Sequence, residues 1–437
     1  MQEYSIVFTA AGTGGHVVSA LSVISQLKKL LPKEAHESIL FVGSTNLRYG
    51  QAHKPSIEEK LVTQAGINFV KIRSGKLQRI VNWPTFLRFF KLGAKIPLGF
   101  WDAFWLMRKV RPKVVIGFGG YVTPSVILGG KLAGATTAIH EQTIAPGAAN
   151  KAASFFADTI FITYPQSVQG FSRFVRKRIT HVGYPLRDDF FVTKSLEELS
   201  EFQQKPKLLE FLQRVSKMHK RVPFILIMGG SSGSHVINLA AAKIVPKLAQ
   251  KAYVLVLTGE PGYYDDFALM QQVVQTLPKK LQSRVFVEKY LNALPHVLKM
   301  VDVVVGRSGA GAVYEFGVLK KPSVLVPLPF TRGGEQKKHA QLLEKIGLGV
   351  IVEQSGLFSL DEGLLLDAIL ERLDKAMCAP EFKTSKKYSS LIKNKRLYKK
   401  TFVENAAEKI ARWVAQKAGF GDAKRDRYTK SAGSTAR

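Results

Sequence analysis

The sequence predicts an α/β protein made of two tandem, doubly wound domains, each with a parallel sheet. Three observations predict this fold. Short apolar runs alternate with segments long enough for helices, the order of strand, glycine loop and helix occurs twice, and 437 residues exceed one compact core. The carboxyl ends of the two sheets are expected to face a common cleft.

The first half contains six short apolar runs that we expect to be strands. They lie at 5–10 (SIVFTA), 38–43 (SILFVG), 68–72 (NFVKI), 113–118 (KVVIGF), 136–140 (TTAIH) and 158–163 (DTIFIT). Strands that alternate with helices are typical of βαβ units in a parallel sheet. The first domain is therefore predicted over residues 1–188.

The second half repeats this organisation. A polar, helix-like segment at about 195–221 precedes VPFILIMGGSSGSH (222–235), which again supplies a strand, a glycine loop and the start of a helix. Further strands are expected in the runs YVLVLTG (253–259), RVFVEK (284–289), DVVVGRSG (302–309) and PSVLVPL (322–328). The second domain is therefore predicted over residues 189–380.

The composition favours a strongly basic intracellular protein. Lys and Arg number 64 against 33 Asp and Glu, a net charge of +31 that attracts phosphates, nucleic acids or anionic lipids. The single cysteine, Cys378, excludes an internal disulfide, and no Cys and His set offers a structural zinc site. We expect no signal peptide, because the first residues have the pattern of a strand. We also expect no membrane-spanning helix, because the most apolar stretch, 96–107, is too short.

Residues 381–437 are expected to form a basic extension, with sixteen Lys and Arg against five acidic residues. Within it, 405–418 has Ile410, Trp413 and Val414 on one face, which is the spacing of an amphipathic helix. The last twenty or so residues are expected to be disordered. The charge of this extension either adds to binding of anionic lipids or belongs to a solvated tail.

Three loops that follow predicted strands of the first domain are candidates for a phosphate site. They are AGTGGH, which ends at His16, GFGGY (117–121), and HEQTIAPGAANK (140–151). Glycines let backbone N–H groups and a helix N-terminus approach an anion closely, because no Cβ stands in the way. In an open α/β sheet such loops gather at one edge. The alternative for a single loop is a tight turn without a ligand, and the spacing matches neither a P-loop nor a dinucleotide motif.

Two loops of the second domain have the pattern of a nucleotide site. GGSSGSH (229–235) offers a glycine turn with hydroxyls, and RSGAGAVYEFG (307–317) places Glu315 one to two turns into a helix. A carboxylate there can accept hydrogen bonds from two ribose hydroxyls. An exposed helix glutamate is the alternative interpretation.

Together, these motifs resemble one enzyme family. GTGGH, GFGGY, HEQ, GYPLR, GGSSGS, RSGA with Glu315, and GEQ occur in the order found in the MurG family, which are glycosyltransferases of family 28 with the GT-B fold of two Rossmann-like domains. The resemblance implies an inverting enzyme that moves GlcNAc from UDP-GlcNAc to the MurNAc 4-hydroxyl of lipid I, forming lipid II in peptidoglycan biosynthesis. It implies no cofactor and no metal. It also implies a peripheral protein at the cytoplasmic face of the cell membrane, with partners in cell-wall synthesis.

The resemblance assigns a lipid-acceptor site to the first domain and a UDP-sugar site to the second. The implied donor contacts are Arg187, Ser231, Ser308, Gly309, Glu315, Glu335 and Gln336. The implied acceptor contacts are Thr13, Gly14, Gly15, Gly119, Gly120, Tyr121, His140, Glu141, Gln142 and Asn150. Arg187 and Ser231 would hold the donor diphosphate, and Glu315 the ribose. The helix at 405–418 would pack back on the first domain.

The resemblance assigns catalysis to His16, as the general base for the acceptor hydroxyl. Transfer would then be a direct displacement at the anomeric carbon with inversion, and a helix N-terminus and Arg187 would stabilise the leaving UDP. Without the resemblance, a histidine that follows a strand is more often a capping or packing residue.

The sequence departs from the family pattern at seven positions. They are Ala11 in place of Gly, Ser19 of Pro, Thr143 of Asn, Tyr184 of Asn, Gly311 of Leu, Ala312 of Thr, and His339 of Asn. Ala312 lacks a hydroxyl that would contact phosphate. The departures therefore bear on donor affinity more than on the class of reaction.

The segment from Lys71 to Lys113 has the composition of a membrane-binding surface. Eleven basic residues and a single acidic one, Asp102, are interleaved with eight aromatic residues. Basic side chains that flank aromatic anchors suit the headgroup layer of an anionic bilayer. The expected membrane contacts are Trp83, Phe86, Phe89, Phe90, Trp101 and Trp105. The alternatives are packing of these aromatics on the sheet and a nucleic-acid surface, although we expect no nucleic-acid partner because no such module is recognisable.

Two other functions stay open at this point. One is a different GT-B transferase that uses a UDP-sugar and a lipid acceptor. The other is a non-catalytic membrane-binding or RNA-binding protein built on the same fold.

Overall fold

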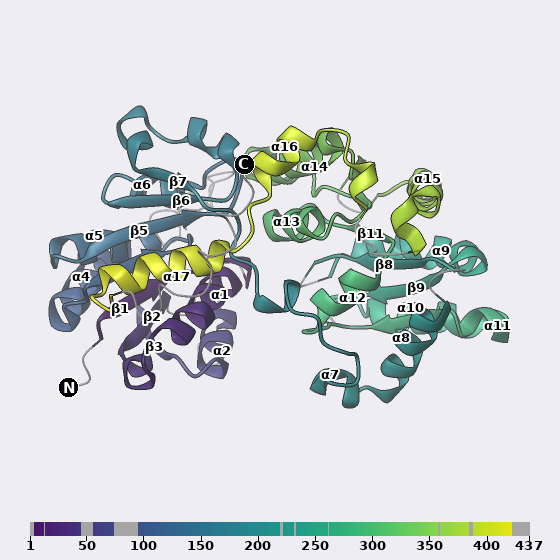
Figure 1. Ribbon diagram of the computed structural model, residues 1–437, viewed down its shortest axis with the longest axis horizontal. Coiled ribbons are helices and arrows are strands. Elements are labelled where there is room, and N and C mark those ends of the chain that lie inside the picture. Colours follow the sequence, from purple (N-terminus) through teal and green to yellow (C-terminus); the bar gives the residue numbers. More distant parts are fainter. Residues whose placement is uncertain are drawn as a thin grey trace, which may run out of the picture. The chain divides into compact units, whose positions relative to one another are not determined.

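The computed structural model describes residues 4–12, 14–44, 56–73, 95–218, 222–230, 233–260, 262–356, 359–383 and 388–421. The chain forms two compact units, Met1–Leu186 with Asn405–Arg437, and Arg187–Glu404 (Figure 1). The predicted division between 188 and 189 lies close to the first of these boundaries. The predicted extension 381–437 is divided between the units, because the chain returns to the first unit at Asn405. The end that we expected to be disordered lies almost entirely outside the described residues.

The first unit is built on a sheet of seven parallel strands in the order β3-β2-β1-β4-β5-β6-β7. The strands are β1 Ile6–Thr9, β2 Ile39–Ser44, β3 Asn68–Ile72, β4 Val114–Gly117, β5 Thr136–Glu141, β6 Thr159–Ile162 and β7 Ile179–His181. All six predicted strands are present. The edge strand β7 escaped prediction because it has three residues and contains no apolar run.

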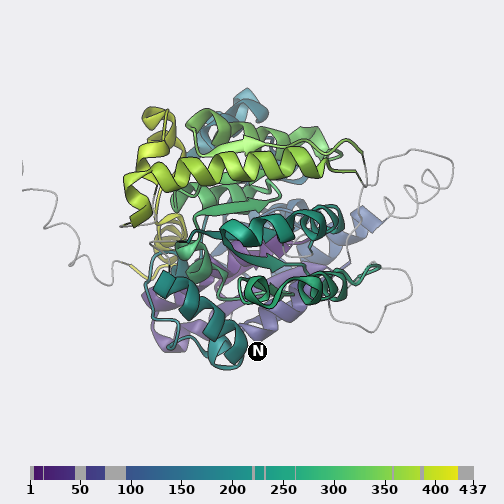
Figure 2. The same cartoon turned by 90° about the vertical axis from the view of Figure 1, so that its right-hand side faces the viewer.

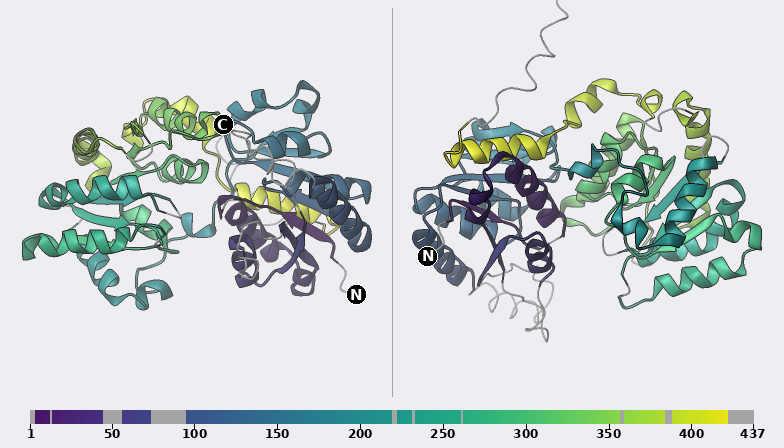
Figure 3. Two further views of the ribbon diagram at one scale, coloured as in Figure 1. Left: turned by 180° about the vertical axis from the view of Figure 1, so that it is seen from behind. Right: turned by 60° about the horizontal axis from the view of Figure 1, so that its bottom comes forward.

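Helices cover both faces of this sheet. One face packs against α1 (Gly14–Leu30), α2 (Ile57–Gln64) and α17 (Ala406–Lys417). The other packs against α4 (Lys95–Val110), α5 (Thr123–Leu132) and α6 (Ala148–Ala153). The helix α17 lies along α1, as Figure 3 shows in yellow and dark purple. Short 3₁₀ helices span Lys33–Ser38, Pro165–Gly170 and Arg173–Arg178.

The second unit is built on six parallel strands in the order β10-β9-β8-β11-β12-β13. They are β8 Phe224–Met228, β9 Tyr253–Leu257, β10 Val285–Glu288, β11 Val303–Gly306, β12 Ser323–Leu325 and β13 Gly349–Ile351. Each of the five predicted strands is present, and only the short edge strand β13 was missed. The doubly wound parallel-sheet architecture predicted from the sequence is confirmed for both units.

The helices of the second unit complete two layers around its sheet. The helices α9 (His235–Lys251), α10 (Asp266–Thr276) and α15 (Glu362–Cys378) share one apolar core with the strands (Figure 2). The remaining helices are α7 Ser200–Gln203, α8 Pro206–Met218, α11 Lys279–Gln282, α12 Leu294–Met300, α13 Ala310–Val318, α14 Glu335–Ile346 and α16 Lys395–Thr401. Short 3₁₀ helices span Asp188–Phe190, Arg332–Gly334, Pro380–Lys383 and Ser389–Leu391. The predicted helix-like segment at 195–221 corresponds to α7 and α8.

Within the described part of the chain, no helix is both long enough and apolar enough to cross a membrane. Because all strands of each sheet are parallel, the loops that follow them meet at one edge. In the first unit these are the loops after β1, β4 and β5, and in the second unit those after β8, β11 and β12.

Candidate active site

The first two glycine loops of the first unit are joined by their backbones. The amide of Ala11 donates to the carbonyl of Gly119 at 3.1 Å, and the amide of Phe118 donates to the carbonyl of Thr9 at 2.8 Å. Gly120 has a φ of +89°, and a Cβ built on it would lie 2.0 Å from the carbonyl oxygen of Ala11. Only glycine allows this approach, so the two loops form one backbone surface.

His16 lies half-buried in the first turn of α1, beside this surface. Its Nδ1 lies 3.1 Å from the carbonyl oxygen of Ala11, which can only accept a hydrogen bond, so Nδ1 carries the proton of the neutral ring. The lone pair is then on Nε2, which lies 3.1 Å from a Cβ position built on Gly119. Burial lowers the pKa of His16, and this effect outweighs the opposing charges of Glu141 and Glu58. The imidazole is therefore neutral at neutral pH.

The third loop, after β5, adjoins the first two. His140 is buried, and its Nε2 donates to the carbonyl of Gly183 at 3.1 Å. Burial lowers the pKa of His140 to about 4. Asn150 Nδ2 donates to the carbonyl of His140 at 3.1 Å, and it lies 3.6 Å from the same Cβ position on Gly119. The structure thus gathers the three loops at one edge, as the sequence predicted.

Three buried polar atoms at this edge have no hydrogen-bond partner among the described residues. They are Nδ1 of His140, Nε2 of Gln142 and Oδ1 of Asn150. Buried polar groups normally have partners, supplied by protein, water or ligand. Tyr121 is half-buried nearby, and burial raises the pKa of its hydroxyl, which bonds to Ser44. The remaining implied acceptor contacts are Gly14 and Gly15, which begin α1, and Thr13, which lies outside the described residues.

Glu315 lies on α13 of the second unit and is half-buried, so the exposed-helix interpretation is wrong. Burial raises the pKa of Glu315 to about 7, and the positive charge of Arg187 opposes this rise. The charge of Arg187, the first residue of the unit, therefore acts on Glu315. A guanidinium and a carboxylate at one place suit a ligand that carries both phosphate and hydroxyl groups.

Ser308 and Gln336 hydrogen-bond to the protein's own backbone. The hydroxyl of Ser308 donates to the carbonyl of Gln336 at 2.8 Å, and Oε1 of Gln336 accepts from the amide of Leu328 at 3.0 Å. His339, at a position where the sequence departs from the family pattern, is buried with its Nδ1 3.2 Å from the carbonyl oxygen of Ser308. Burial lowers the pKa of His339 to about 4. These contacts join the loop after β11 to α14 and the loop after β12.

The other implied donor contacts lie at the starts of helices or outside the described residues. Gly309 precedes the first residue of α13, and Glu335 is the first residue of α14, after Gly333 and Gly334 with positive φ. Ser231 lies outside the described residues.

Arg307 is a residue of this site that sequence reasoning left without a role. Its Nη2 donates to the hydroxyl of Ser234 at 2.8 Å, and its Nη1 donates to Oε1 of Gln354 at 2.8 Å. Burial lowers the pKa of Arg307 to about 10. Through these two hydrogen bonds, Arg307 connects Ser234, at the end of the GGSSGS loop, to Gln354, in the segment that follows β13. Its place at the start of the RSGA motif was the signal that could have identified it.

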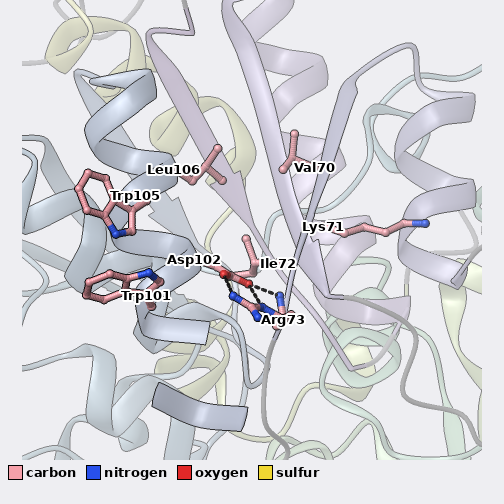
Figure 4. A pocket seen from close by; sticks show the side chains of 8 residues that line it. All are labelled: Val70, Lys71, Ile72, Arg73, Trp101, Asp102, Trp105 and Leu106. Carbon is pink, nitrogen blue, oxygen red and sulfur yellow. Dashed lines mark hydrogen bonds and ion pairs between the residues drawn. The ribbon is translucent and has the colours of Figure 1, made fainter. Parts of the chain in front are cut away.

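The predicted membrane surface lies partly within the described residues. Trp101 and Trp105 on α4 are 60% and 54% exposed, and their rings meet edge to face with centroids 5.7 Å apart. Asp102 between them accepts from Nε of Arg73 at 2.8 Å, beside an open pocket of about 490 Å³ (Figure 4). For these two tryptophans the core-packing alternative is wrong. The other expected contacts, Trp83, Phe86, Phe89 and Phe90, lie outside the described residues.

Comparison with known sequences places these features in one family. The glycosyltransferase family 28 N-terminal domain matches residues 6–162, and the family 28 C-terminal domain matches residues 224–394. Two similar proteins are UDP-N-acetylglucosamine–N-acetylmuramyl-(pentapeptide) pyrophosphoryl-undecaprenol N-acetylglucosamine transferases. The one from Bacillus cereus is 32% identical over 348 residues, which are 79% of this chain and 86% of that protein. The one from Caldicellulosiruptor saccharolyticus is 28% identical over 392 residues, 88% of this chain and 94% of that protein.

Solved structures agree on the fold. Acinetobacter baumannii MurG superposes with a TM-score of 0.63 at 18% identity, over 94% of this chain and 99% of that one. The calicheamicin glycosyltransferase CalG4 has a TM-score of 0.60 at 16% identity, over 96% of this chain and 99% of that one. UDP-GlcNAc 2-epimerase from Neisseria meningitidis has a TM-score of 0.57 at 13% identity, over 94% of this chain and all of that one. The fold is thus GT-B but is shared by an epimerase, so the reaction class rests on sequence. Both domain matches and the 32% identity show that the chain belongs to glycosyltransferase family 28.

Proposed function

We propose that this protein is an inverting glycosyltransferase that moves GlcNAc from UDP-GlcNAc to the MurNAc 4-hydroxyl of lipid I, forming lipid II in peptidoglycan biosynthesis. The observation that carries the proposal is the state of His16. Its ring is neutral, its Nδ1 proton is held by the carbonyl of Ala11, and its Nε2 lone pair lies beside the glycine backbone of the loop after β4. The sequence similarity to transferases named for this reaction supports it.

His16 acts as the general base. The acceptor hydroxyl gives its proton to Nε2 as its oxygen attacks the anomeric carbon of GlcNAc, and the bond from that carbon to UDP breaks. The attack comes from the face opposite the leaving group, so the anomeric configuration inverts. The backbone of the glycine loops, bare of side chains at Gly14, Gly119 and Gly120, receives the diphosphate of the acceptor.

The second unit holds the donor. Glu315 accepts hydrogen bonds from the ribose hydroxyls, and Arg187 neutralises the charge that develops on the UDP diphosphate as it leaves. Ser308, Gln336 and Arg307 hold the loops around this site through the hydrogen bonds described above. The proposal includes no cofactor, and UDP-GlcNAc is counted as a substrate.

The protein works as a peripheral protein at the cytoplasmic face of the cell membrane. The exposed pair Trp101 and Trp105 on α4 enters the headgroup layer, and the excess of Lys and Arg draws the first unit to anionic lipids. This brings the acceptor loops to a substrate whose lipid tail stays in the bilayer.

Donor binding is the first experiment. Titration calorimetry with UDP-GlcNAc, UDP-GalNAc and UDP-glucose should show a preference for UDP-GlcNAc, and Glu315→Ala should abolish it. The exposed Glu210→Gln, in the same unit, serves as the matched control. Absence of binding to all three nucleotides would contradict the proposal and favour a non-catalytic protein.

Transfer to lipid I then tests the reaction. The wild-type protein should form lipid II, and His16→Ala should lower kcat by about 100-fold or more, since a general base contributes that much. Circular dichroism confirms that the variant is folded. Transfer to another lipid acceptor in preference to lipid I would assign the protein to a different GT-B transferase.

A further inference from the structure

Glu141, the last residue of β5, accepts hydrogen bonds from the loop that follows it and from Asn150 on α6. It is only 3% exposed. Its Oε1 accepts from the amide of Thr143 at 2.9 Å and lies 2.8 Å from the hydroxyl of Thr143, whose single proton is shared with the carbonyl oxygen of Ala145 at 2.7 Å. Its Oε2 accepts from the amide of Gly147 at 3.1 Å and from Nδ2 of Asn150 at 3.0 Å. A carboxylate has about four lone-pair positions, so these contacts occupy most of its capacity to accept hydrogen bonds.

The residues that bind Glu141 belong to the loop beside His16. Asn150 donates from one nitrogen both to Oε2 of Glu141 and to the carbonyl of His140. Nδ2 of Asn150 and Nε2 of His16 lie 3.6 and 3.1 Å from the position that a Cβ on Gly119 would occupy. Oδ1 of Asn150, in contrast, is buried and has no partner among the described residues. Glu141 therefore holds Asn150 in the orientation that leaves this oxygen without a protein partner among the described residues.

The charge of Glu141 also reaches His16. Burial lowers the pKa of His16, and the negative charge of Glu141 is the largest effect that raises it. Among the described residues, Glu58 of α2 also raises the pKa of His16, and His140 of β5 interacts electrostatically with His16. Glu58 is held by the amide of Gly12 at 2.9 Å. A buried carboxylate that cannot move or pair with a cation is a fixed source of negative charge.

We propose that Glu141 is a positioning residue that acts on the reaction through His16 and Asn150, and not an acceptor contact as the family resemblance implied. It keeps the base strong enough to take a proton in spite of its burial, and it orients the amide of Asn150. Thr143, which departs from the family pattern, belongs to this arrangement, because its amide and hydroxyl both face Oε1. The inference rests on the proposed function, in which His16 is the base.

The decisive variant is Glu141→Gln, which removes the charge and keeps the shape. NMR titration of His16, assigned with His16→Gln, should show a lower midpoint in Glu141→Gln than in the wild-type protein. In transfer assays the acid limb of the kcat/KM profile should move to lower pH. The plateau of kcat should fall by about tenfold or more because a weaker base transfers less efficiently, while the acceptor KM stays within a factor of two or three. Glu34→Gln, an exposed residue of the same unit, should change none of these quantities.

Two outcomes would overturn the proposal. One is an unchanged His16 midpoint in a folded Glu141→Gln protein. The other is a raised acceptor KM at unchanged kcat, which would make Glu141 a direct acceptor contact. If Glu141→Gln does not fold, Thr143→Val supplies the test, because it removes one donor to Oε1 but keeps the charge. It should lower kcat several-fold without raising the acceptor KM or moving the His16 midpoint, and an unchanged kcat would count against the positioning role.

The two readouts separate this inference from the proposed function. The His16 titration needs no substrate, so a shifted midpoint in a protein without transferase activity would keep the electrostatic link and refute the function. Transferase activity together with an unchanged His16 midpoint would support the proposed function and refute the electrostatic link.

Discussion

At the scale of single residues, the glycines of the acceptor loops differ in what they require. Gly120 has a φ of +89° and no room for a Cβ beside the carbonyl of Ala11, whereas a Cβ on Gly14 would meet nothing within 4 Å. Gly120 is therefore needed by the fold. Gly14 is needed only if a ligand approaches the backbone there.

This contrast gives a matched pair of variants. Gly120→Ala should destabilise the first unit by about 2 to 4 kcal/mol, through the strained φ and the overlap with Ala11. Gly14→Ala should leave the thermal unfolding midpoint unchanged or raise it, because alanine favours a helix, and should raise the acceptor KM. Thermal unfolding and steady-state kinetics check both. Equal stability of the two variants would show that the close contact at Gly120 is not required.

Glu315, which we propose binds the donor, is a residue whose burial lowers the stability of the ligand-free protein. Burial raises its pKa to about 7, so the folded protein resists ionisation of this carboxyl more than the unfolded chain does. The cost is present above pH 7 and shrinks as pH falls towards the ordinary pKa of glutamate. Glu315→Gln should therefore stabilise the ligand-free protein by about 1 to 2 kcal/mol at pH 8, less than the pKa shift alone implies, because partial solvent contact and the charge of Arg187 weaken the effect.

The same comparison at pH 5 should show a smaller gain. Differential scanning calorimetry at both pH values measures the effect, and titration with UDP-GlcNAc should show that the more stable variant binds the donor more weakly. A variant less stable than wild type at pH 8 would mean that Glu315 is held by contacts rather than strained by burial.

At the scale of elements, α17 is the part of the basic extension that the first unit requires. Its residues Ile410 and Val414 are fully buried in the core that contains α1, and Trp413 meets Phe161 edge to face with ring centroids 5.4 Å apart. The preceding segment is bonded to the second unit, where the hydroxyl of Tyr314 donates to the carbonyl of Val403 at 2.7 Å. One predicted region thus serves two separate cores.

A charge in the buried face of α17 should disrupt the first unit. Ile410→Asp should cost at least about 4 kcal/mol, since it removes apolar burial and buries a carboxylate without a partner. Lys409→Asp, one residue away and exposed, should be tolerated. Thermal unfolding of both purified proteins is the measurement. Similar midpoints for the two would mean that α17 contributes little to stability.

At the scale of the whole molecule, we propose that the net charge of +31 and the exposed tryptophans of α4 act together in membrane binding. Trp101→Glu with Trp105→Glu should weaken binding to vesicles that contain phosphatidylglycerol by about tenfold or more. Raising the salt concentration from about 0.1 M to about 1 M should also weaken binding of the wild-type protein to these vesicles, because the Debye length falls from about 10 to about 3 Å.

Vesicle co-sedimentation measures both effects. Leu364→Glu, at an exposed apolar residue of the second unit, is the control and should bind as the wild type does. Equal binding of the double variant and the wild type would show that the tryptophans of α4 do not contribute to membrane binding. Equal binding to neutral and anionic vesicles would show that the net positive charge does not contribute to membrane binding.

The sequence by itself determined the doubly wound fold, the repeat of that fold, and the glycine loops that follow its strands. It could do so because strand and helix periodicity and the steric freedom of glycine are local properties. Two short edge strands, β7 and β13, escaped because pairing with a neighbouring strand, and not their own pattern, makes them strands.

Only the tertiary structure decided which atoms of the site are available. The proton on Nδ1 of His16 follows from the carbonyl of Ala11, the hydrogen bonds of Glu141 come from Thr143, Gly147 and Asn150, and those of Arg307 go to Ser234 and Gln354. It also decided that Trp101 faces solvent and Ile410 the core. These outcomes depend on hydrogen-bond partners and on burial, which folding sets by bringing together groups that local sequence patterns do not relate.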